Sequence, residues 1–169
     1  GILKVIDMLK GFGGDCLLGM RGNHDYDNGM LEVWERFEKN MGDNMLLLNE
    51  MQPYKLNDFN LDVTVYPALC QSKHSETNNL DWIRELEMED ENNLHLGIGH
   101  GALSGISPDL NQKYYNMSEK ELEEIGVDLW LLGHTHIPYP VQKEVTGWKI
   151  YNAGTPEPDG MDCNHAGQA

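Results

Sequence analysis

Three short clusters in the sequence combine glycine with histidine, and each follows an apolar stretch. They are Gly-Asn-His-Asp at 22–25, Gly-His-Gly at 99–101 and Gly-His-Thr-His at 133–136. Glycine permits a tight backbone turn, so the side chain beside it can be aimed from the end of a rigid element into a cleft. Three such turns in one chain indicate a shared site that is rich in imidazole groups.

The histidines of the third cluster have a spacing that brings two imidazoles together. In an extended segment, residues i and i+2 point to one face, with their Cα atoms about 6 to 7 Å apart. We therefore expect His134 and His136 to address the same cleft. They could hold one ion, but the spacing also suits two ions about 3.5 to 4 Å apart, the arrangement used to hydrolyse phosphate esters.

The metal-binding groups available in these clusters are imidazole nitrogens and the side-chain oxygen of Asn23, with no thiolate. This set suits manganese, iron, zinc or nickel and does not suit a soft-metal site. The sequence therefore predicts divalent metal ions from this group without choosing among them.

The elements that must position the clusters alternate between helices and short apolar strands. The first half of the chain is predicted to contain a helix over 2–9, a strand over 16–20, a helix over 30–39, a strand over 45–48 and an antiparallel hairpin of 52–56 with 61–66. The second half is predicted to contain a helix over 80–88, a strand over 94–98, a helix from the capping box Ser118–Glu121 to Gly126, a strand over 127–132 and a hairpin of 141–145 with 148–151. This order predicts an α/β fold with helices on the outer faces of its sheets, in which ligands gather at the carboxyl ends of strands.

Length, charge and cysteine usage limit the class of protein. The 169 residues fit a single domain, taken as residues 1–169. A net charge of −16 argues against affinity built on basic contacts to nucleic-acid phosphates and against binding to an anionic membrane surface. No apolar run approaches the roughly 20 residues of a membrane span. Cys16, Cys70 and Cys163 form no CxxC pair, which favours a reducing, cytoplasmic setting.

The three clusters, in this order and each after an apolar strand, resemble those of the calcineurin-like metallophosphoesterase superfamily. The resemblance covers nearly the whole chain, and the blocks at 22–25 and 133–136 are its most specific part. It implies a four-layer αββα sandwich, with two β-sheets face to face and helices outside. It also implies phosphoester hydrolysis at a binuclear metal centre that uses a metal-bridging hydroxide.

A finer resemblance points to the DNA-repair exonuclease-like, small phosphodiesterase subgroup. It rests on Pro156-Glu157-Pro158 and on the long insert between Asn40 and His74. It implies phosphodiesterase-like activity on a phosphoester substrate, with a nucleotide or a nucleic acid as candidates.

The superfamily resemblance implies roles for individual residues. Asn23, His100 and His134 match the positions that bind one metal, and His136 matches a ligand of the other. His24 matches the histidine that contacts the transferring phosphoryl group and protonates the leaving oxygen. That role suits an imidazole, which titrates near neutral pH. A supporting or turn role is the alternative for His24.

The chain departs from the superfamily pattern before Gly22. Members carry a DxH pair and then a GD motif upstream, which supply the remaining ligands and a bridging carboxylate, and neither block is present. Asp7 lies inside the expected first helix, and Asp15 lies too close to Asn23 for the GD position. We therefore expect a domain that lacks its N-terminal strands, with an abrupt tail at the other end. A degenerate fold serving as a non-catalytic protein-interaction scaffold is the alternative function.

Several other polar side chains have weaker signals. Asp25 is expected to be structural, either fixing its loop or capping the start of the next helix. His74 lies in a polar stretch and is expected in a loop, with substrate contact as the alternative. His95 is opposite in phase to Leu94 and Leu96 and is therefore expected on the surface.

Two further groups of residues invite a functional interpretation. Tyr114 and Tyr115 are expected to pack against the sheet, with stacking on a nucleotide base as the alternative. Asp162, Cys163 and His165 have metal-binding side chains, but they fall in a tail without periodicity, so we expect a loop there.

Overall fold

The computed structural model describes residues 1–26, 31–89, 92–107, 109, 111–141 and 147–157. Its elements follow one another in the order α1 (Ile2–Lys10), β1 (Leu17–Met20), α2 (Leu31–Asn40), β2 (Met45–Leu48), β3 (Tyr54–Lys55), η1 (Asn57–Phe59), β4 (Val63–Ala68), α3 (Asp81–Arg84), β5 (Leu94–Gly101), α4 (Glu119–Glu124), β6 (Leu129–His134) and β7 (Ile150–Asn152). The predicted alternation of helices with short strands is confirmed, and so is the antiparallel pairing of β3 with β4.

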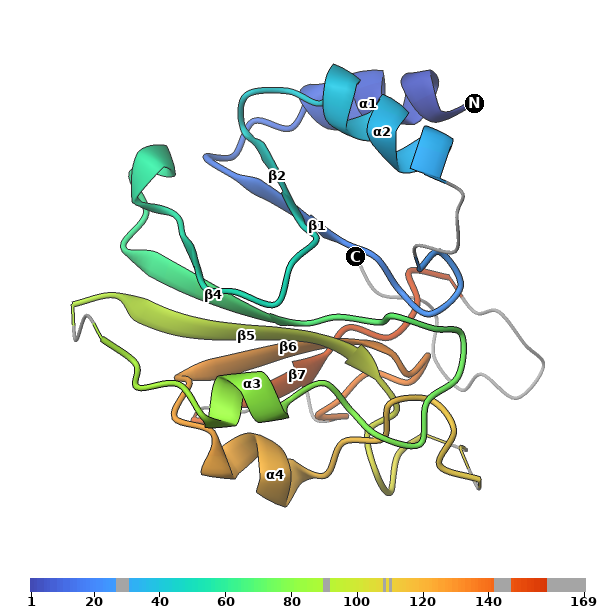
Figure 1. The fold of residues 1–169 in the computed structure, drawn as a ribbon, viewed down its shortest axis with the longest axis vertical. Coiled ribbons are helices and arrows are strands. Elements are labelled where there is room, and N and C mark those ends of the chain that lie inside the picture. Colours follow the sequence, from blue (N-terminus) through green and yellow to red (C-terminus); the bar gives the residue numbers. More distant parts are fainter. Residues whose placement is uncertain (27–30, 90–91, 108, 110, 142–146, 158–169) are drawn as a thin grey trace.

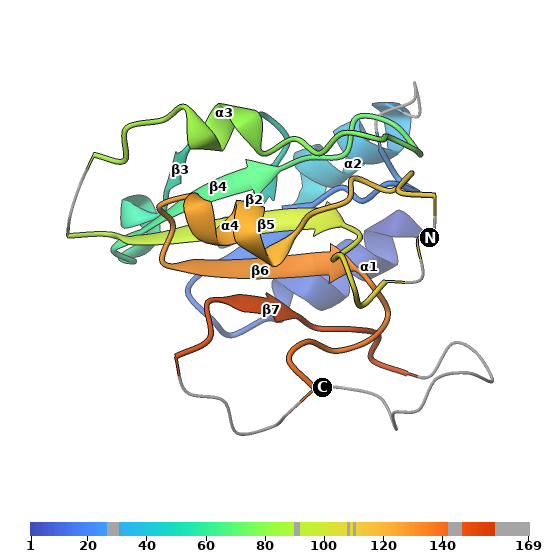
Figure 2. The same cartoon turned by 90° about the horizontal axis from the view of Figure 1, so that it is seen from below.

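The strands form two sheets, which lie between two layers of helices (Figure 1). β1 and β2 pair in parallel, and the larger sheet has the order β3-β4-β5-β6-β7. Figure 1 shows α1 and α2 outside the small sheet, and α3 and α4 outside the large one. The predicted order of helices, sheet, sheet and helices is confirmed. Figure 2 shows β4 to β7 running in one direction, so their carboxyl ends lie at the same edge of the sheet.

The two faces of β5 pack against different layers of the fold. Leu96 and Ile98 pack into the apolar core between the sheets. Gly97 faces the helix layer, where the absence of a side chain leaves room for the Trp130 ring. Because side chains alternate along a strand, His100 is placed on the same face as Leu96 and Ile98, toward the small sheet. The register of β5 therefore decides where this histidine points.

Apolar side chains from the helices pack against both sheets. On the large sheet, Trp130 is buried, and its Nε1 donates a hydrogen bond to the Leu122 carbonyl oxygen of α4 at 2.9 Å. On the small sheet, α1 and α2 pack through Ile6 and Phe37 against Met45 of β2. Burial of a large apolar side chain stabilises a fold by roughly 1.5 to 3 kcal/mol. The loops that follow the strands are thus anchored to a packed core.

The boundaries of α3 differ from the prediction, whereas the start of α4 agrees with it. α3 covers Asp81–Arg84 and not 80–88. The residues that follow include Glu85 and Glu89, whose like charges would lie one helical turn apart and oppose continuation. At α4 the predicted capping box is present, because Glu121 N donates to Ser118 Oγ at 3.2 Å and Ser118 N donates to Glu121 Oε2 at 3.0 Å.

The ends of three other elements also differ from the prediction. α4 ends at Glu124, and the buried Ile125 takes the cap position expected for Gly126. β5 and β6 continue beyond their predicted ends, to Gly101 and His134. The glycine-histidine cluster at 99–101 therefore lies wholly within β5, and the first half of the cluster at 133–136 lies within β6.

The expectation that His95 lies on the surface is wrong. The side chain is only 8% exposed, and its Nδ1 lies 2.8 Å from the Tyr66 hydroxyl oxygen. The face of β5 opposite Leu96 is not solvated, because the helix layer covers it and Trp82 of α3 packs beside Tyr66. Strand alternation identified the correct face of the sheet but not the layer that covers it.

The last predicted hairpin is only partly covered by the described residues. Its first arm falls largely on 142–146, which lie outside them, as do Asp162, Cys163 and His165. The second arm overlaps β7, which pairs in parallel with β6. Among the residues that the structure describes, no helix combines the length and the apolar character that crossing a membrane requires.

Candidate metal centre

Three segments that are remote in sequence meet at the carboxyl edge of the sheets. The loop after β1 carries Asn23, while β5 and β6 end in the clusters that contain His100 and His134. In the register of these neighbouring parallel strands, His100 is opposite Gly133 and Gly101 is opposite His134. The two histidines are therefore diagonal neighbours, and their ring centroids are 5.2 Å apart.

Asn23 lies at the centre of this meeting point and is 1% exposed. Its Oδ1 is 3.0 Å from His100 Nε2 and 3.3 Å from His134 Nδ1. Its Nδ2 donates a hydrogen bond to the Lys73 carbonyl oxygen at 3.2 Å. Because the amide nitrogen is used by the Lys73 carbonyl, the amide oxygen is turned toward both imidazoles.

The spacing of these three atoms fits the ligands of one metal ion. A ligand nitrogen or oxygen typically lies about 2.0 to 2.2 Å from a zinc-like ion, which separates neighbouring ligand atoms by about 3.0 to 3.5 Å in octahedral or tetrahedral geometry. The two distances from Asn23 Oδ1 fall in that range. Within the described residues no group of three or more His, Cys, Asp or Glu side chains is arranged to hold a metal ion.

Burial favours the neutral form of both imidazoles. Burial is the main cause that lowers the pKa of His100 to about 4, and the charge of His134 lowers it further, while the charge of Asp25 opposes the shift. Burial also lowers the pKa of His134, followed by the charge of His136. A metal ion binds the neutral form of histidine, so the site is prepared to accept a cation.

The family comparison agrees with this geometry. The sequence model of the calcineurin-like phosphoesterase family matches residues 3–138, a range that contains all three clusters. The chain belongs to the calcineurin-like phosphoesterase family. A comparison with curated protein sequences gave no match. The family is associated with metal-dependent hydrolysis of phosphoesters.

The two other predicted site residues of this phosphoesterase family member, His24 and His136, lie on the open side of the cluster. Both side chains are exposed. Their charges lower the pKa values of His100 and His134, so all four imidazoles share one electrostatic environment. The buried triad of Asn23, His100 and His134 is thus bordered by two solvent-accessible histidines.

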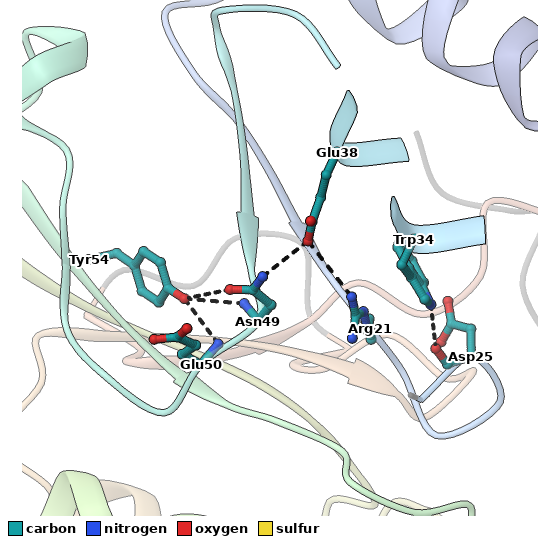
Figure 3. A network of polar contacts seen from close by, with 7 residues as sticks. All are labelled: Arg21, Asp25, Trp34, Glu38, Asn49, Glu50 and Tyr54. Atoms are coloured by element: carbon teal, nitrogen blue, oxygen red, sulfur yellow. Dashed lines mark hydrogen bonds and ion pairs between the residues drawn. The ribbon is translucent and has the colours of Figure 1, made fainter. Parts of the chain in front are cut away.

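Asp25 holds the loop that carries Asn23, as expected. Gly22 N donates a hydrogen bond to Asp25 Oδ1 at 2.6 Å, which closes the turn. Trp34 Nε1 donates to the Asp25 carbonyl oxygen at 3.1 Å (Figure 3). The Arg21 guanidinium lies 4.8 Å from the centroid of the Trp34 ring and 3.9 Å from Glu38 Oε1. The loop is therefore tied to α2 from both sides of the Asn23 position.

The backbone at His134 departs from the extended form that the sequence interpretation assumed. Its φ is 93°, and β6 ends at this residue. The turn that follows is held by Asn152 of β7, whose Nδ2 donates to the carbonyl oxygens of Thr135 at 2.7 Å and Ile137 at 2.8 Å. The simple two-residue alternation therefore does not describe how His134 and His136 are oriented.

Several residues around the site were not identified from the sequence. The Lys73 carbonyl orients Asn23, and the buried Cys70 thiol donates to the His100 carbonyl oxygen at 3.3 Å. Tyr114 lies with its ring centroid 5.2 Å from that of His134. Tyr114 was considered from the sequence for packing or base stacking, but its contact with His134 was not. A main-chain carbonyl such as that of Lys73 leaves no trace in a sequence pattern.

The contacts of His74 and Tyr115 bear on the roles that the sequence left open for them. His74 lies in an exposed loop, as expected, and its ring centroid is 5.1 Å from that of Tyr114. Tyr115 is buried, and its hydroxyl accepts hydrogen bonds from the backbone N–H groups of Gln71 at 2.9 Å and Ser72 at 2.7 Å. Tyr115 is therefore packed inside the protein and presents no exposed surface on which a base could stack.

Proposed function

We propose that this protein hydrolyses phosphoesters, with a preference for phosphodiesters, at a binuclear centre of divalent metal ions. The observation that carries the proposal is the convergence of Asn23 Oδ1 with His100 Nε2 at 3.0 Å and with His134 Nδ1 at 3.3 Å. Three polar side chains that are buried or half-buried at the carboxyl ends of parallel strands, or directly after them, are typical of a ligand site.

Asn23, His100 and His134 would hold one ion, and His136 would contribute to the second. When bound, such ions polarise phosphoryl oxygens and lower the pKa of water, which yields a nucleophile at neutral pH. The imidazole and amide ligands are compatible with manganese, iron, zinc or nickel. Because all of these ligands are neutral, we expect them to hold a dication less tightly than a set that includes a carboxylate.

His24 is proposed as the general acid. It is exposed and follows Asn23 in the loop after β1, so its ring can approach a substrate bound at the centre. In the proposed step a ring N–H of His24 gives its proton to the oxygen of the leaving alcohol as the phosphorus–oxygen bond breaks. The hydrogen bonds from Gly22 N and Trp34 Nε1 to Asp25 restrict the movement of this loop.

The hydrolase proposal is favoured over the scaffold alternative by the state of the triad. A protein-interaction scaffold does not require Asn23 to be buried with its oxygen facing two imidazoles. An amide oxygen that faces two ring nitrogens at 3.0 and 3.3 Å is instead compatible with the ligands of a shared metal ion.

Among substrates, we propose a small phosphodiester, such as a nucleotide derivative, in preference to duplex DNA. The net charge of −16 disfavours long contacts with a polyanion. We also propose a reducing, cytoplasmic setting, because Cys16 and Cys70 are free thiols.

The test compares hydrolysis of bis-p-nitrophenyl phosphate with that of p-nitrophenyl phosphate at several salt concentrations. The metal-free protein is loaded with Mn²⁺, its metal content is measured, and His134→Ala is assayed in parallel. We expect faster hydrolysis of the diester and loss of activity in the variant. A preference for the monoester would remove the diesterase assignment, and no hydrolysis at full metal loading would contradict the proposed function.

A further inference from the structure

The orientation of the His134 ring is not explained by its own strand. With φ at 93°, His134 adopts a backbone conformation that residues with a Cβ atom rarely occupy. Such a conformation persists only where surrounding contacts hold it. Asn23 contacts one edge of the imidazole, and the His100 ring lies 5.2 Å away with an angle of 73° between the ring planes. A further contact, closer to parallel with the ring, would fix its plane.

Tyr114 provides that further contact. Its ring centroid is 5.2 Å from that of His134, with an angle of 32° between the ring planes. Its ring is also 5.1 Å from that of His74, at 47°. Both separations are in the range of about 4.5 to 7 Å in which aromatic rings attract each other. The tyrosine is thus packed between a metal-site imidazole and a loop imidazole.

The backbone holds Tyr114 firmly in this place. Ala102 N, directly after β5, donates to the Tyr114 carbonyl oxygen at 2.8 Å. Tyr114 N donates to Asp109 Oδ2 at 3.0 Å, and the residue forms a parallel bridge with Ser75. Ala102 follows directly after β5, the strand that carries His100. The hydrogen bond from Ala102 therefore fixes the position of Tyr114 relative to that strand.

We propose that Tyr114 is a positioning residue of the metal centre, whose ring holds the His134 imidazole with Nδ1 directed at Asn23. The ring, and not the hydroxyl, performs this role, since within the described residues the Tyr114 hydroxyl has no hydrogen-bond partner. The proposal rests on the proposed function, because it requires His134 to bind a divalent ion. It also implies that the face of Tyr114 against His134 is not free to stack on a nucleotide base.

The test measures Mn²⁺ affinity of the metal-free full chain by calorimetry for the wild type, Tyr114→Phe and Tyr114→Leu. The matched control is Tyr54→Leu, which removes a tyrosine from the edge strand β3. We expect Tyr114→Phe and the control to bind as the wild type does. We expect Tyr114→Leu to bind about 10- to 100-fold more weakly, as is typical when a group that orients a metal ligand is lost.

Equal affinities for the wild type and Tyr114→Leu would overturn this proposal alone, and equal weakening in Tyr114→Phe would overturn the assignment to the ring. A wild type that binds no divalent ion would overturn both this proposal and the proposed function. Should Tyr114→Leu fail to fold, nuclear Overhauser contacts between the Tyr114 and His134 rings in the wild type decide the matter. Their presence in the metal-free and metal-loaded protein is expected, and their absence would overturn the proposal.

Discussion

Gly22 lies against the His100 ring so closely that a Cβ atom at position 22 would be 2.8 Å from His100 Cε1. Because real Cβ contacts are longer, any side chain at this position must move either the imidazole or the loop. The glycine therefore allows the loop after β1 to bring Asn23 against His100.

Gly22→Ala is expected to displace the His100 imidazole from Asn23 and to weaken Mn²⁺ binding by about tenfold or more. Overpacking of this kind also costs about 1 to 3 kcal/mol of stability. Calorimetric titration of the metal-free protein measures the first effect. Gly13→Ala is the matched control, since a Cβ there would meet nothing within 4 Å. Equal affinity in both variants would show that the close contact does not matter.

His134→Ala is expected to abolish metal binding at the site shared with Asn23 and His100, since it removes one of the three converging donors. Metal content after dialysis against a defined concentration of Mn²⁺ measures the loss. His95→Gln serves as the control, because it alters a buried histidine on the helix side of β5. That variant should lose stability and keep its metal. Unchanged affinity in His134→Ala would mean that the ligand assignment is wrong.

The metal-free protein should become less stable as the pH falls from about 6.5 to about 4. Folding lowers the pKa of His100 to about 4, chiefly by burial, whereas an unfolded histidine titrates near about 6.5. Between these values the unfolded chain binds a proton that the folded chain does not, so acid favours unfolding. The stabilisation that the neutral His100 side chain provides is therefore fully present above about pH 6.5, and it is lost as the pH falls toward about 4.

Urea unfolding at a series of pH values across this range measures the effect. His100→Gln should show a shallower loss of unfolding free energy than the wild type, because the titrating group is absent. Parallel curves for the two proteins would contradict the prediction.

The Cys70 thiol should resist alkylation in the folded protein. Burial, followed by the charge of Asp25, raises the pKa of Cys70 to about 12, so the reactive thiolate is scarce near pH 8. Mass spectrometry after iodoacetamide treatment and digestion measures labelling at each cysteine. In urea, Cys70 should react at the rate of an ordinary thiol. Fast labelling of Cys70 in the native protein would indicate that the strand ends open readily.

Local features of the chain were predicted well, and the capping box of α4 illustrates why. The contacts between Ser118 and Glu121 join residues three positions apart, so short-range geometry alone decides them. The same holds for the alternation of Leu96 and Ile98 in β5, which depends on strand geometry. By contrast, His95 was misplaced because its surroundings come from α3, a separate segment of the chain.

The types of donor at the candidate metal site, their glycine neighbours and the strands that carry them could be predicted from the residues alone, because each depends on a few adjacent positions. Which donors meet was indicated only by the resemblance to the superfamily, since local patterns do not contain it. Asn23 and His134 are separated by 111 positions, and their contact depends on how two sheets pack and on the register of β5 against β6. The placement of Tyr114 beside His134 depends on the same packing. Long-range contacts of this kind are decided by the burial and hydrogen bonding of the whole fold, which no short stretch of residues contains.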